Sequence, residues 1–162
     1  MAAKKKAAAK KAAPKKSIDA ITLLKNDHET VRGLLSQFEN ATGTRREKLR
    51  GQIEQELKVH TTIEEEIFYP AFREASRKKD DKKLYFEAVE EHHVVDMVIP
   101  ELNDGRDNEE LKAKAKVLKD IVEHHAEEEE TEMFPRARKL FSRDELRSLG
   151  EQMQLRKEAL KA

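Results

Sequence analysis

The residues with the clearest potential for chemistry lie in two copies of one sequence pattern. The first copy runs from His60 to Pro70 and the second from His125 to Pro135. In each, glutamate follows the histidine at +4 and +5, an aromatic residue at +9 and proline at +10. Positions i and i+4 lie one turn apart on the same face of an α-helix. Each copy can therefore direct an imidazole and a carboxylate, both metal ligands, to one point.

The neighbouring apolar residues indicate that each histidine and its +4 glutamate face the interior. Both pairs continue an apolar series with helical spacing. The series are Ile53, Leu57, His60, Glu64 and Ile67 in the first copy and Leu118, Val122, His125, Glu129 and Met133 in the second. A buried carboxylate beside a buried imidazole is costly unless a positive charge neutralises it. We therefore predict that the two His–Glu pairs bind one metal ion or a pair of ions.

Two further histidines take core positions in the segments that precede the two copies. His28 is followed by apolar residues at +3, +6, +7 and +10, and His92 repeats this spacing whereas His93 does not. Neighbours on a helix diverge by about 100°, so only one of each adjacent pair can face inward. The same comparison favours His125 over His124. The predicted metal ligands are His28, His60, Glu64, His92, His125 and Glu129, with His93, His124, Glu128 and Asp96 as alternatives.

The other residues of the two copies are expected to be structural. Tyr69 and Phe134, which precede the two prolines, are expected to pack in the core. The remaining glutamates are expected to form a solvated acidic face, with Glu128 replacing Glu129 if the helix is rotated. These glutamates are Glu65, Glu66, Glu127, Glu128, Glu130 and Glu132.

The spacing of apolar residues predicts four long helices joined by short polar turns. We expect a first helix that begins at Ser17 or Asp19 and ends near residue 40, followed by helices at residues 44–70, 82–102 and 107–135. Capping boxes are expected to begin at Thr44 and Ser142, with a bend or end at Pro70. The predicted fold is all-α, an antiparallel up-down-up-down four-helix bundle with an extra C-terminal helix. Its predicted regions are a Lys/Ala-rich tail (1–16), the bundle (17–141) and the C-terminal helix (142–162).

Composition narrows the chemistry of the expected metal site. Charged residues make up 41% of the chain, with only 5 glycines and 4 prolines, as expected for a helical protein. The chain contains no cysteine, which excludes disulfides, thiolate zinc sites and cysteine-ligated iron–sulfur clusters. Any metal must be held by nitrogen and oxygen, a ligand set that suits iron, manganese or zinc.

These motifs resemble those of the hemerythrin-like, or HHE cation-binding, domain family. The resemblance covers residues 17–140 and rests on His28, Glu91-His92 and the two patterns, His60-x-x-x-Glu64-Glu65 with Tyr69-Pro70 and His125-x-x-x-Glu129-Glu130 with Phe134-Pro135. It implies a non-haem centre of two iron ions, with Glu64 and Glu129 bridging them and the four histidines as terminal ligands; manganese or zinc would be the less expected metals. It also implies that the protein binds, senses or handles oxygen, nitric oxide, peroxide or iron itself.

The sequence departs from the oxygen carriers of this family in its histidine count. Those members use five histidines, two of them one turn apart on the third helix, whereas the residue four positions after His92 is Asp96. The fifth ligand would be His124, His93, Asp96 or water. Water would leave an open coordination position, which favours peroxide or nitric oxide chemistry over reversible oxygen carriage. No dedicated acid–base pair is evident, so we expect a binding protein, with weak peroxide or nitric oxide chemistry as the enzymatic alternative.

The charge distribution suggests a second function. Residues 1–16 contain seven lysines and no acidic residue, so the other 146 residues carry 26 basic against 33 acidic side chains. The tail is expected to be disordered, and its lysines could contact nucleic-acid phosphates without sequence preference. The alternative is thus a DNA-surface or nucleoid-associated stress protein. No apolar run is long enough to span a bilayer and no apolar signal core is evident, so we expect a cytoplasmic protein without membrane contact.

Overall fold

The computed structural model describes residues 18–103 and 108–162, and nearly all of these residues are helical. The long helices are α1 (Ala20–Glu39), α2 (Gly43–Ile63), α4 (Lys79–Val98), α5 (Asn108–Glu128) and α7 (Arg143–Lys161). The short elements are the π-helical turn η1 (Glu64–Phe68), α3 (Tyr69–Ala75), the 3₁₀ turn η2 (Ile99–Asn103), the π-helical turn η3 (Glu129–Met133) and α6 (Phe134–Leu140). The expected tail, residues 1–16, lies outside the described residues.

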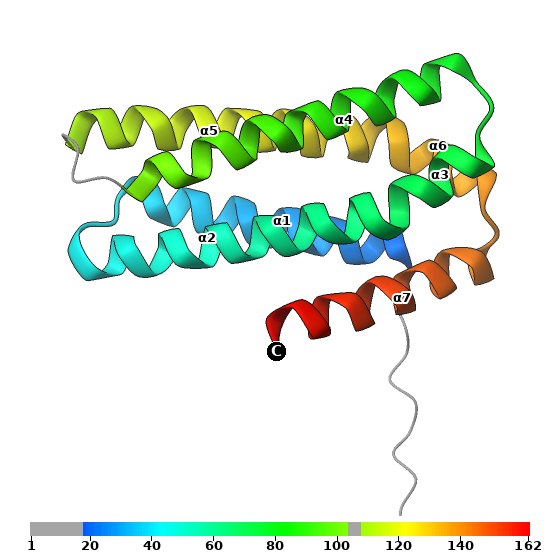
Figure 1. Ribbon diagram of the computed structural model, residues 1–162, viewed down its shortest axis with the longest axis horizontal. Helices are drawn as coiled ribbons and strands as arrows, with labels where there is room; N and C mark the ends of the chain where they lie inside the picture. Colours follow the sequence, from blue (N-terminus) through cyan, green and yellow to red (C-terminus); the bar gives the residue numbers. More distant parts are fainter. Residues whose placement is uncertain (1–17, 104–107) are drawn as a thin grey trace, which may run out of the picture.

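Four long helical rods form the bundle (Figure 1): α1, α2 with η1 and α3, α4 with η2, and α5 with η3 and α6. One layer contains α1 beside α2, and the other contains α4 beside α5, while α7 runs along the outside of the first layer. The second rod continues without interruption from α2 through η1 into α3, and the fourth from α5 through η3 into α6. The predicted bundle with an extra C-terminal helix is therefore observed, and Pro70 lies inside a continuous rod rather than at its end.

The C-terminal helix α7 packs against α1, α2 and η1. Its start is the predicted capping box, in which Ser142 accepts from the Glu145 backbone N–H and the Glu145 side chain accepts from the Ser142 N–H. Gly150 permits the close approach to α1, because an added Cβ would overlap the Ile18 carbonyl oxygen and lie 2.8 Å from the Ala20 nitrogen. A glycine thus fixes where α7 crosses the start of α1.

The capping box predicted at Thr44 is wrong. The helix begins one residue earlier, at Gly43, and its N-cap residue Thr42 makes no side-chain capping bond. Gly43 adopts a φ of 53°, a conformation that glycine reaches without strain, so the chain turns before Thr44. The Arg46 Nε donates to the Ala41 carbonyl oxygen at 2.7 Å and ties the turn to this helix start.

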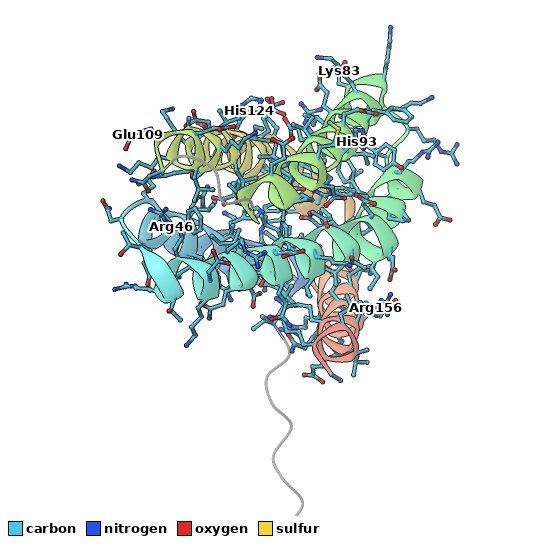
Figure 2. The ribbon with its side chains drawn as sticks, turned by 60° about the vertical axis from the view of Figure 1, so that its left-hand side comes forward. Arg46, Lys83, His93, Glu109, His124 and Arg156 are labelled. Carbon is cyan, nitrogen blue, oxygen red and sulfur yellow. The ribbon has the colours of Figure 1, made fainter. Side chains whose placement is uncertain are left out.

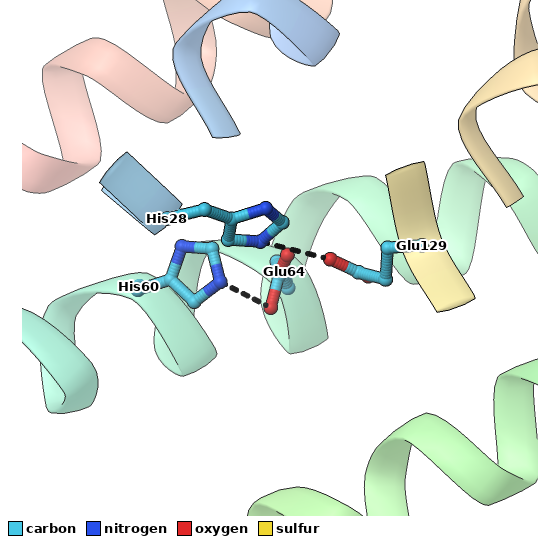
Figure 3. A group of neighbouring side chains, drawn as sticks. All are labelled: His28, His60, Glu64 and Glu129. Atoms are coloured by element: carbon cyan, nitrogen blue, oxygen red, sulfur yellow. Dashed lines mark ion pairs between the residues drawn. The ribbon is translucent and has the colours of Figure 1, made fainter. Parts of the chain in front are cut away.

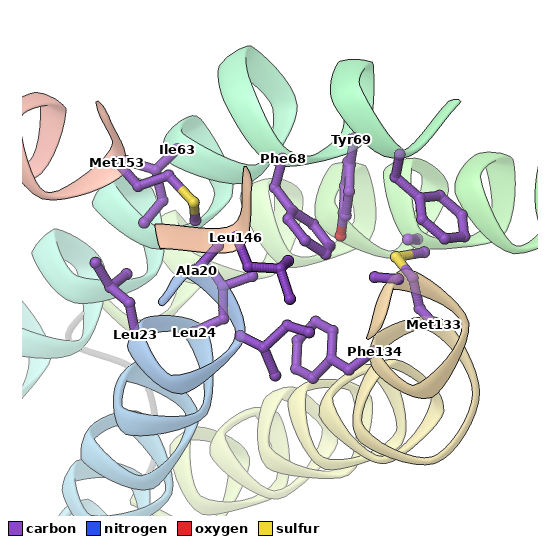
Figure 4. Packing of buried hydrophobic residues seen from close by; sticks show 14 of the residues in the cluster. Ala20, Leu23, Leu24, Ile63, Phe68, Tyr69, Met133, Phe134, Leu146 and Met153 are labelled. Atoms are coloured by element: carbon purple, nitrogen blue, oxygen red, sulfur yellow. The ribbon is translucent and has the colours of Figure 1, made fainter. Parts of the chain in front are cut away.

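The interior consists of two apolar clusters with a polar layer between them. The first cluster lies near α7, α3 and α6 and includes Phe68, Phe72 and Phe134 (Figure 4). The second fills the opposite half of the bundle and includes Phe38 and Leu118. The buried polar side chains that separate them are mostly histidines and carboxylates. Such a layer is costly in an apolar interior, so it marks the part of the fold that needs a functional explanation.

Candidate metal centre

The polar layer contains all six side chains that the sequence indicated as inward-facing. Each is at most 6% exposed, and Glu64 is fully buried. They come from all four rods of the bundle, with one histidine from each rod and the two glutamates from the first residues of η1 and η3. These side chains are His28, His60, Glu64, His92, His125 and Glu129.

The first group of neighbouring ligand atoms contains His28, His60, Glu64 and Glu129 (Figure 3). One nitrogen or oxygen atom from each residue belongs to the group, and these four atoms all lie within 4.8 Å of one another. The His28 Nε2 lies 3.2 Å from the Glu129 Oε2. The His60 Nε2 lies 3.2 Å from the Glu64 Oε2. Two ligands that are each about 2.1 Å from one ion lie roughly 3.0–3.4 Å apart in octahedral or tetrahedral geometry, so these separations suit an ion.

The second group contains Glu64, His92 and His125. The His92 Nε2 lies 3.2 Å from the Glu64 Oε2, and the His125 Nε2 lies 3.9 Å from the same oxygen. Glu129 also approaches this group, with its Oε2 3.6 Å from the His125 Nε2. Each carboxylate therefore touches histidines of both groups, an arrangement that fits two adjacent ions joined by carboxylates.

Several of these atoms lack a hydrogen-bond partner among the described residues. They are the Nε2 atoms of His28 and His60, the Oε1 of Glu64 and the Oε2 of Glu129, all buried. A buried polar atom without a partner costs about 1–3 kcal/mol, and more when it is charged. The atoms point into one region and are of the nitrogen and oxygen types that bind iron, manganese or zinc. The residues present therefore fit a bound metal.

Electrostatics favour positive charge at the same place. Burial alone would raise the pKa of Glu64, but the His60, His125 and His92 imidazoles hold it well below its usual range. Burial would lower the pKa of His125, but Glu129, Glu64 and Glu91 raise it well above its usual range. The pKa values of His28 and His92 are raised by neighbouring glutamates in the same way, against the effect of burial. In the metal-free protein the carboxylates thus favour the positively charged forms of His28, His92 and His125.

Two π-helical turns place the glutamates. In η1 the Tyr69 backbone N–H donates to the Glu64 carbonyl, and in η3 the Phe134 N–H donates to the Glu129 carbonyl, each across five residues. Each turn ends two residues before a proline, which lacks an N–H and collides with the carbonyl four residues earlier in a regular α-helix. The wider turn accommodates the proline without ending the rod. Single π-turns of this kind occur frequently at functional sites.

Tyr69 belongs to the centre, although the sequence indicated only core packing. Its hydroxyl donates to the Glu129 Oε1 at 2.9 Å, and it lies 3.4 Å from both the Glu64 Oε2 and the His92 Nε2. On a regular helix a residue five positions after Glu64 would lie about 140° round the axis. The π-turn takes up the extra residue and returns Tyr69 to the face of Glu64. The signal available in the sequence was the aromatic–proline pair at the same place in both copies.

The second copy places a phenylalanine where the first has this tyrosine. The Tyr69 ring stacks on His92 with centroids 5.6 Å apart, and the Phe134 ring stacks on His28 with centroids 5.9 Å apart. The aromatic residue of each copy therefore makes an equivalent contact with the inward histidine of α1 or α4 in the other half of the bundle. Only the first half adds a hydroxyl, so the centre is chemically asymmetric.

Each of the four histidines also faces a carboxylate through its Nδ1 atom. Three of the Nδ1 atoms lie 2.7–2.8 Å from the carboxylate oxygen, and the fourth lies 3.6 Å away. The pairs are His28–Glu130, His92–Glu65 and His125–Glu91 at the short distances and His60–Asp27 at the long one. A carboxylate that accepts from Nδ1 fixes the imidazole orientation and leaves Nε2 free for a metal. Glu65 and Glu130 thus have a specific role beyond the solvated face expected for them.

Asp27, the carboxylate that faces the Nδ1 atom of His60, contacts the C-terminal helix α7. Lys157 of α7 forms an ion pair and a hydrogen bond with Asp27, and both side chains are largely buried. Burial would raise the pKa of Asp27, but the His60 imidazole and the Lys157 ammonium hold it below its usual value. The helix outside the bundle therefore contributes a cation to the surroundings of the centre.

Replacing Lys157 by methionine is expected to lower the free energy of unfolding by about 1.5–3 kcal/mol, because Asp27 would keep its charge without its strongest donor. Urea denaturation monitored by circular dichroism measures the change. Lys161→Met is the matched control on the same helix, since its pair with Glu56 is more exposed than the Lys157–Asp27 pair, and we expect a loss below about 1 kcal/mol. Equal losses in the two variants would contradict the special role of the Asp27 contact.

Comparison with known proteins agrees with this geometry. The family model of the hemerythrin HHE cation binding domain matches residues 19–137. The chain belongs to this family. Rv2633c of Mycobacterium tuberculosis is 28% identical over 147 residues, which cover 89% of this chain and 88% of that protein. The crystal structure of an HHE domain-containing Rv2633c homolog from Mycobacterium kansasii is 28% identical, with a TM-score of 0.76, and the match covers 88% of this chain and 87% of that one.

Another relative is much longer. A DNA nickase of Nostoc is 26% identical over 132 residues, which are 81% of this chain and 37% of the nickase. The hemerythrin-like chain thus spans little more than a third of that relative. The resemblance seen in the motifs is confirmed by the family match and the solved structure.

The alternative ligands lie outside the buried centre of this hemerythrin-like bundle. His93 and Asp96 are exposed on α4, and His124 is exposed on α5 (Figure 2). Glu128 is partly buried but faces His124, at 3.5 Å, rather than the inner histidines. None of the four therefore supplies a fifth protein ligand to the inner groups as they stand in this structure.

A small cavity adjoins the inner histidines of the hemerythrin-like bundle. Its volume is about 20 Å³, and apolar residues of the second cluster close its far side. Its lining residues are His28, Val31, Leu57, His60, Thr61, His92, Val95, Val122 and His125. A cavity needs roughly 10–15 Å³ to hold a single water, so the space suits a molecule of that size.

Among the described helices, none has the length and apolar character required to cross a membrane.

Proposed function

We propose that the protein is a non-haem di-iron protein that binds a small ligand such as nitric oxide or peroxide. Glu64 and Glu129 would bridge the two ions, and the four inward histidines would complete the ligand set. The observation that carries this proposal is the sharing of one buried carboxylate, Glu64, by both groups of ligand atoms. Bound iron would supply redox electrons and open coordination positions to the small ligand.

The size of the ligand follows from the space beside the histidines. The cavity of about 20 Å³ admits a molecule of one or two heavy atoms and no organic substrate. Buried valine and leucine side chains line it together with the imidazoles. The absence of a fifth histidine from the described inner groups supports an open coordination position, and therefore ligand binding or peroxide chemistry rather than oxygen carriage.

The test is the optical response of the iron-loaded full chain to each ligand. Anaerobic ferrous protein is titrated with nitric oxide, and separately with hydrogen peroxide, while absorption is recorded. We expect a saturable new absorption band with at least one of them. Zinc-loaded protein is the control, because zinc has no redox chemistry and should give no band. A response of the iron form that equals that of the zinc form would refute small-ligand chemistry at the centre.

The Tyr69 hydroxyl is expected to hold Glu129 in its bridging orientation. Burial, together with Glu129 and Glu64, raises the pKa of Tyr69 well above its usual range, so the metal-free protein keeps the proton that bonds to Glu129. Tyr69→Phe is expected to speed iron loss to a chelator by about tenfold, the usual order for removing a partner of a ligand. Tyr85→Phe is the matched control, because the Tyr85 ring packs edge-on against Tyr69 at 5.9 Å. Identical iron loss from both variants would exclude this role.

A nucleic-acid contact through residues 1–16 stays a prediction, because those residues lie outside the described structure. A mobility shift of duplex DNA at low and moderate salt compares the full chain with a chain that lacks residues 1–16. Salt-sensitive binding by the full chain alone would support the contact. Equal behaviour of the two chains would remove it and leave the metal centre as the functional site.

A further inference from the structure

A third group of possible metal ligands lies outside the buried centre. His124 and Glu128 are one turn apart on α5, and Glu91 faces them from α4. The His124 Nε2 lies 3.4 Å from the Glu91 Oε1 and 3.5 Å from the Glu128 Oε1. Two ligands each about 2.1 Å from a tetrahedral ion lie about 3.4 Å apart, so both separations fit one ion. His124 is 62% exposed, and its position on the outer surface of α5 leaves the group open to solvent (Figure 2).

No lysine or arginine of the described residues forms an ion pair with this outer group, and Lys83, which pairs with Glu87, interacts with Glu128 only through charge. Among the described residues, the ion pairs of Glu91 and Glu128 are with histidines alone. Neighbouring carboxylates on the same rod differ, since Glu123 pairs with Arg32 and Glu132 pairs with Arg136. Two carboxylates that share one surface histidine attract a cation, and the nitrogen ligand favours a transition metal over calcium or magnesium.

The outer group is connected directly to the buried centre through Glu91. Its Oε1 faces His124 at the surface, and its Oε2 accepts from the His125 Nδ1 at 2.8 Å. A small cavity of about 10 Å³ lies between the outer and inner groups, and its polar walls are Glu91, Glu128, His125 and Glu129. Carboxylates of the outer group and the inner ligand Glu129 therefore line one cavity, whose other walls are the apolar side chains of Leu84, Ala88 and Met133.

We propose that His124, Glu128 and Glu91 form a third site, which binds a divalent transition-metal ion and passes it to the buried centre. The site has three protein ligands, so water completes its coordination and the ion exchanges readily. The buried groups have four histidines and two shared carboxylates, so they hold ions more tightly. The role in uptake depends on the proposed buried centre, whereas the existence of the third site does not.

The number of bound ions tests the third site. The full chain is stripped of metal and dialysed against a fixed concentration of free zinc, and bound zinc is counted. We compare wild type with the His124→Ala/Glu128→Gln variant and with His93→Ala, an exposed histidine beside His92 that has no part in the group. We expect one zinc ion fewer in the double variant and no change in His93→Ala. Equal counts in wild type and the double variant would overturn the third site.

The rate of loading tests the uptake role. Ferrous ion is added anaerobically to metal-free protein, and the loading of the buried centre is followed through the iron that resists a brief chelator wash. We expect loading to be slower by about tenfold in the double variant, with the same final content of tightly held iron. Unchanged loading would overturn the uptake role.

These measurements also separate this proposal from the di-iron proposal. If the buried centre holds no metal, wild type would bind a single zinc ion that the double variant loses. If the third site does not exist, wild type and the double variant would both retain the ions of the buried centre. A Glu64→Gln/Glu129→Gln variant that still binds one zinc ion would support a third site independent of the inner carboxylates.

Discussion

Replacing Glu64 and Glu129 together by glutamine is expected to abolish the retention of metal by the buried centre. Glutamine keeps the shape of each side chain but removes the negative charge, and its amide nitrogen cannot bind a cation. Both groups of inner ligand atoms contain Glu64, so no complete group remains in the variant. Metal analysis after ferrous loading and desalting measures the effect, which should exceed the loss of about 10–100-fold in affinity expected for removing a partner of a ligand.

The matched control for this variant is Glu65→Gln. Glu65 contacts the Nδ1 of His92 rather than its inward Nε2, and it is partly exposed. The Glu65→Gln substitution should therefore weaken metal binding by no more than about 10–100-fold and leave the stoichiometry unchanged under saturating metal. Circular dichroism establishes that both variants remain helical. Wild-type metal content in the Glu64→Gln/Glu129→Gln variant would show that the inner carboxylates do not hold the metal.

The metal-free protein is expected to lose stability as the pH rises above neutrality. Neighbouring carboxylates raise the pKa values of His28, His92 and His125 in the folded state. A raised folded-state pKa contributes stability that is complete below the ordinary value of 6.5 and is lost as the pH passes through the folded pKa. Glu64 acts in the opposite sense, since its lowered pKa contributes stability that is lost as the pH falls below 4.5.

Bound metal is expected to reverse the trend above neutrality. A metal ion competes with the protons on the histidines, so its affinity increases as the pH rises. The melting temperatures of the metal-free and metal-loaded proteins should therefore separate with pH, and the separation should reach about 10 °C when the free metal is about a thousandfold above its dissociation constant. Melts from pH 6 to pH 9 measure this. A separation that stays constant or narrows toward high pH would contradict histidine ligation.

The inward positions could be predicted because they follow from helical periodicity. The choice of His92 over His93 depended on one comparison of apolar spacing, and the structure buries His92 and exposes His93. The repeat of His-x-x-x-Glu placed both glutamates in one layer. A regular helix is sufficient for these predictions, since His60 and Glu64 are four positions apart and lie one turn apart on the same face.

Other features depended on departures from regular geometry. Tyr69 reaches the centre only because the π-turn before Pro70 adds a residue to the turn. The Nδ1 partners, such as Glu91 for His125, come from a different rod, and their register follows from how the rods pack. The contact of Lys157 with Asp27 likewise follows from packing between helices, because it depends on where Gly150 lets α7 cross α1.

The most direct test of the central claim is the iron content of the full chain. Metal-free protein is loaded with ferrous ion under anaerobic conditions, desalted and analysed for iron and protein, and its absorption is recorded before and after exposure to air. Two tightly held irons per chain, with a new near-ultraviolet band in air, is the result predicted by two ligand groups that share Glu64. A helical protein that retains no iron would contradict the claim and leave the buried histidines and glutamates without the ion that their arrangement requires.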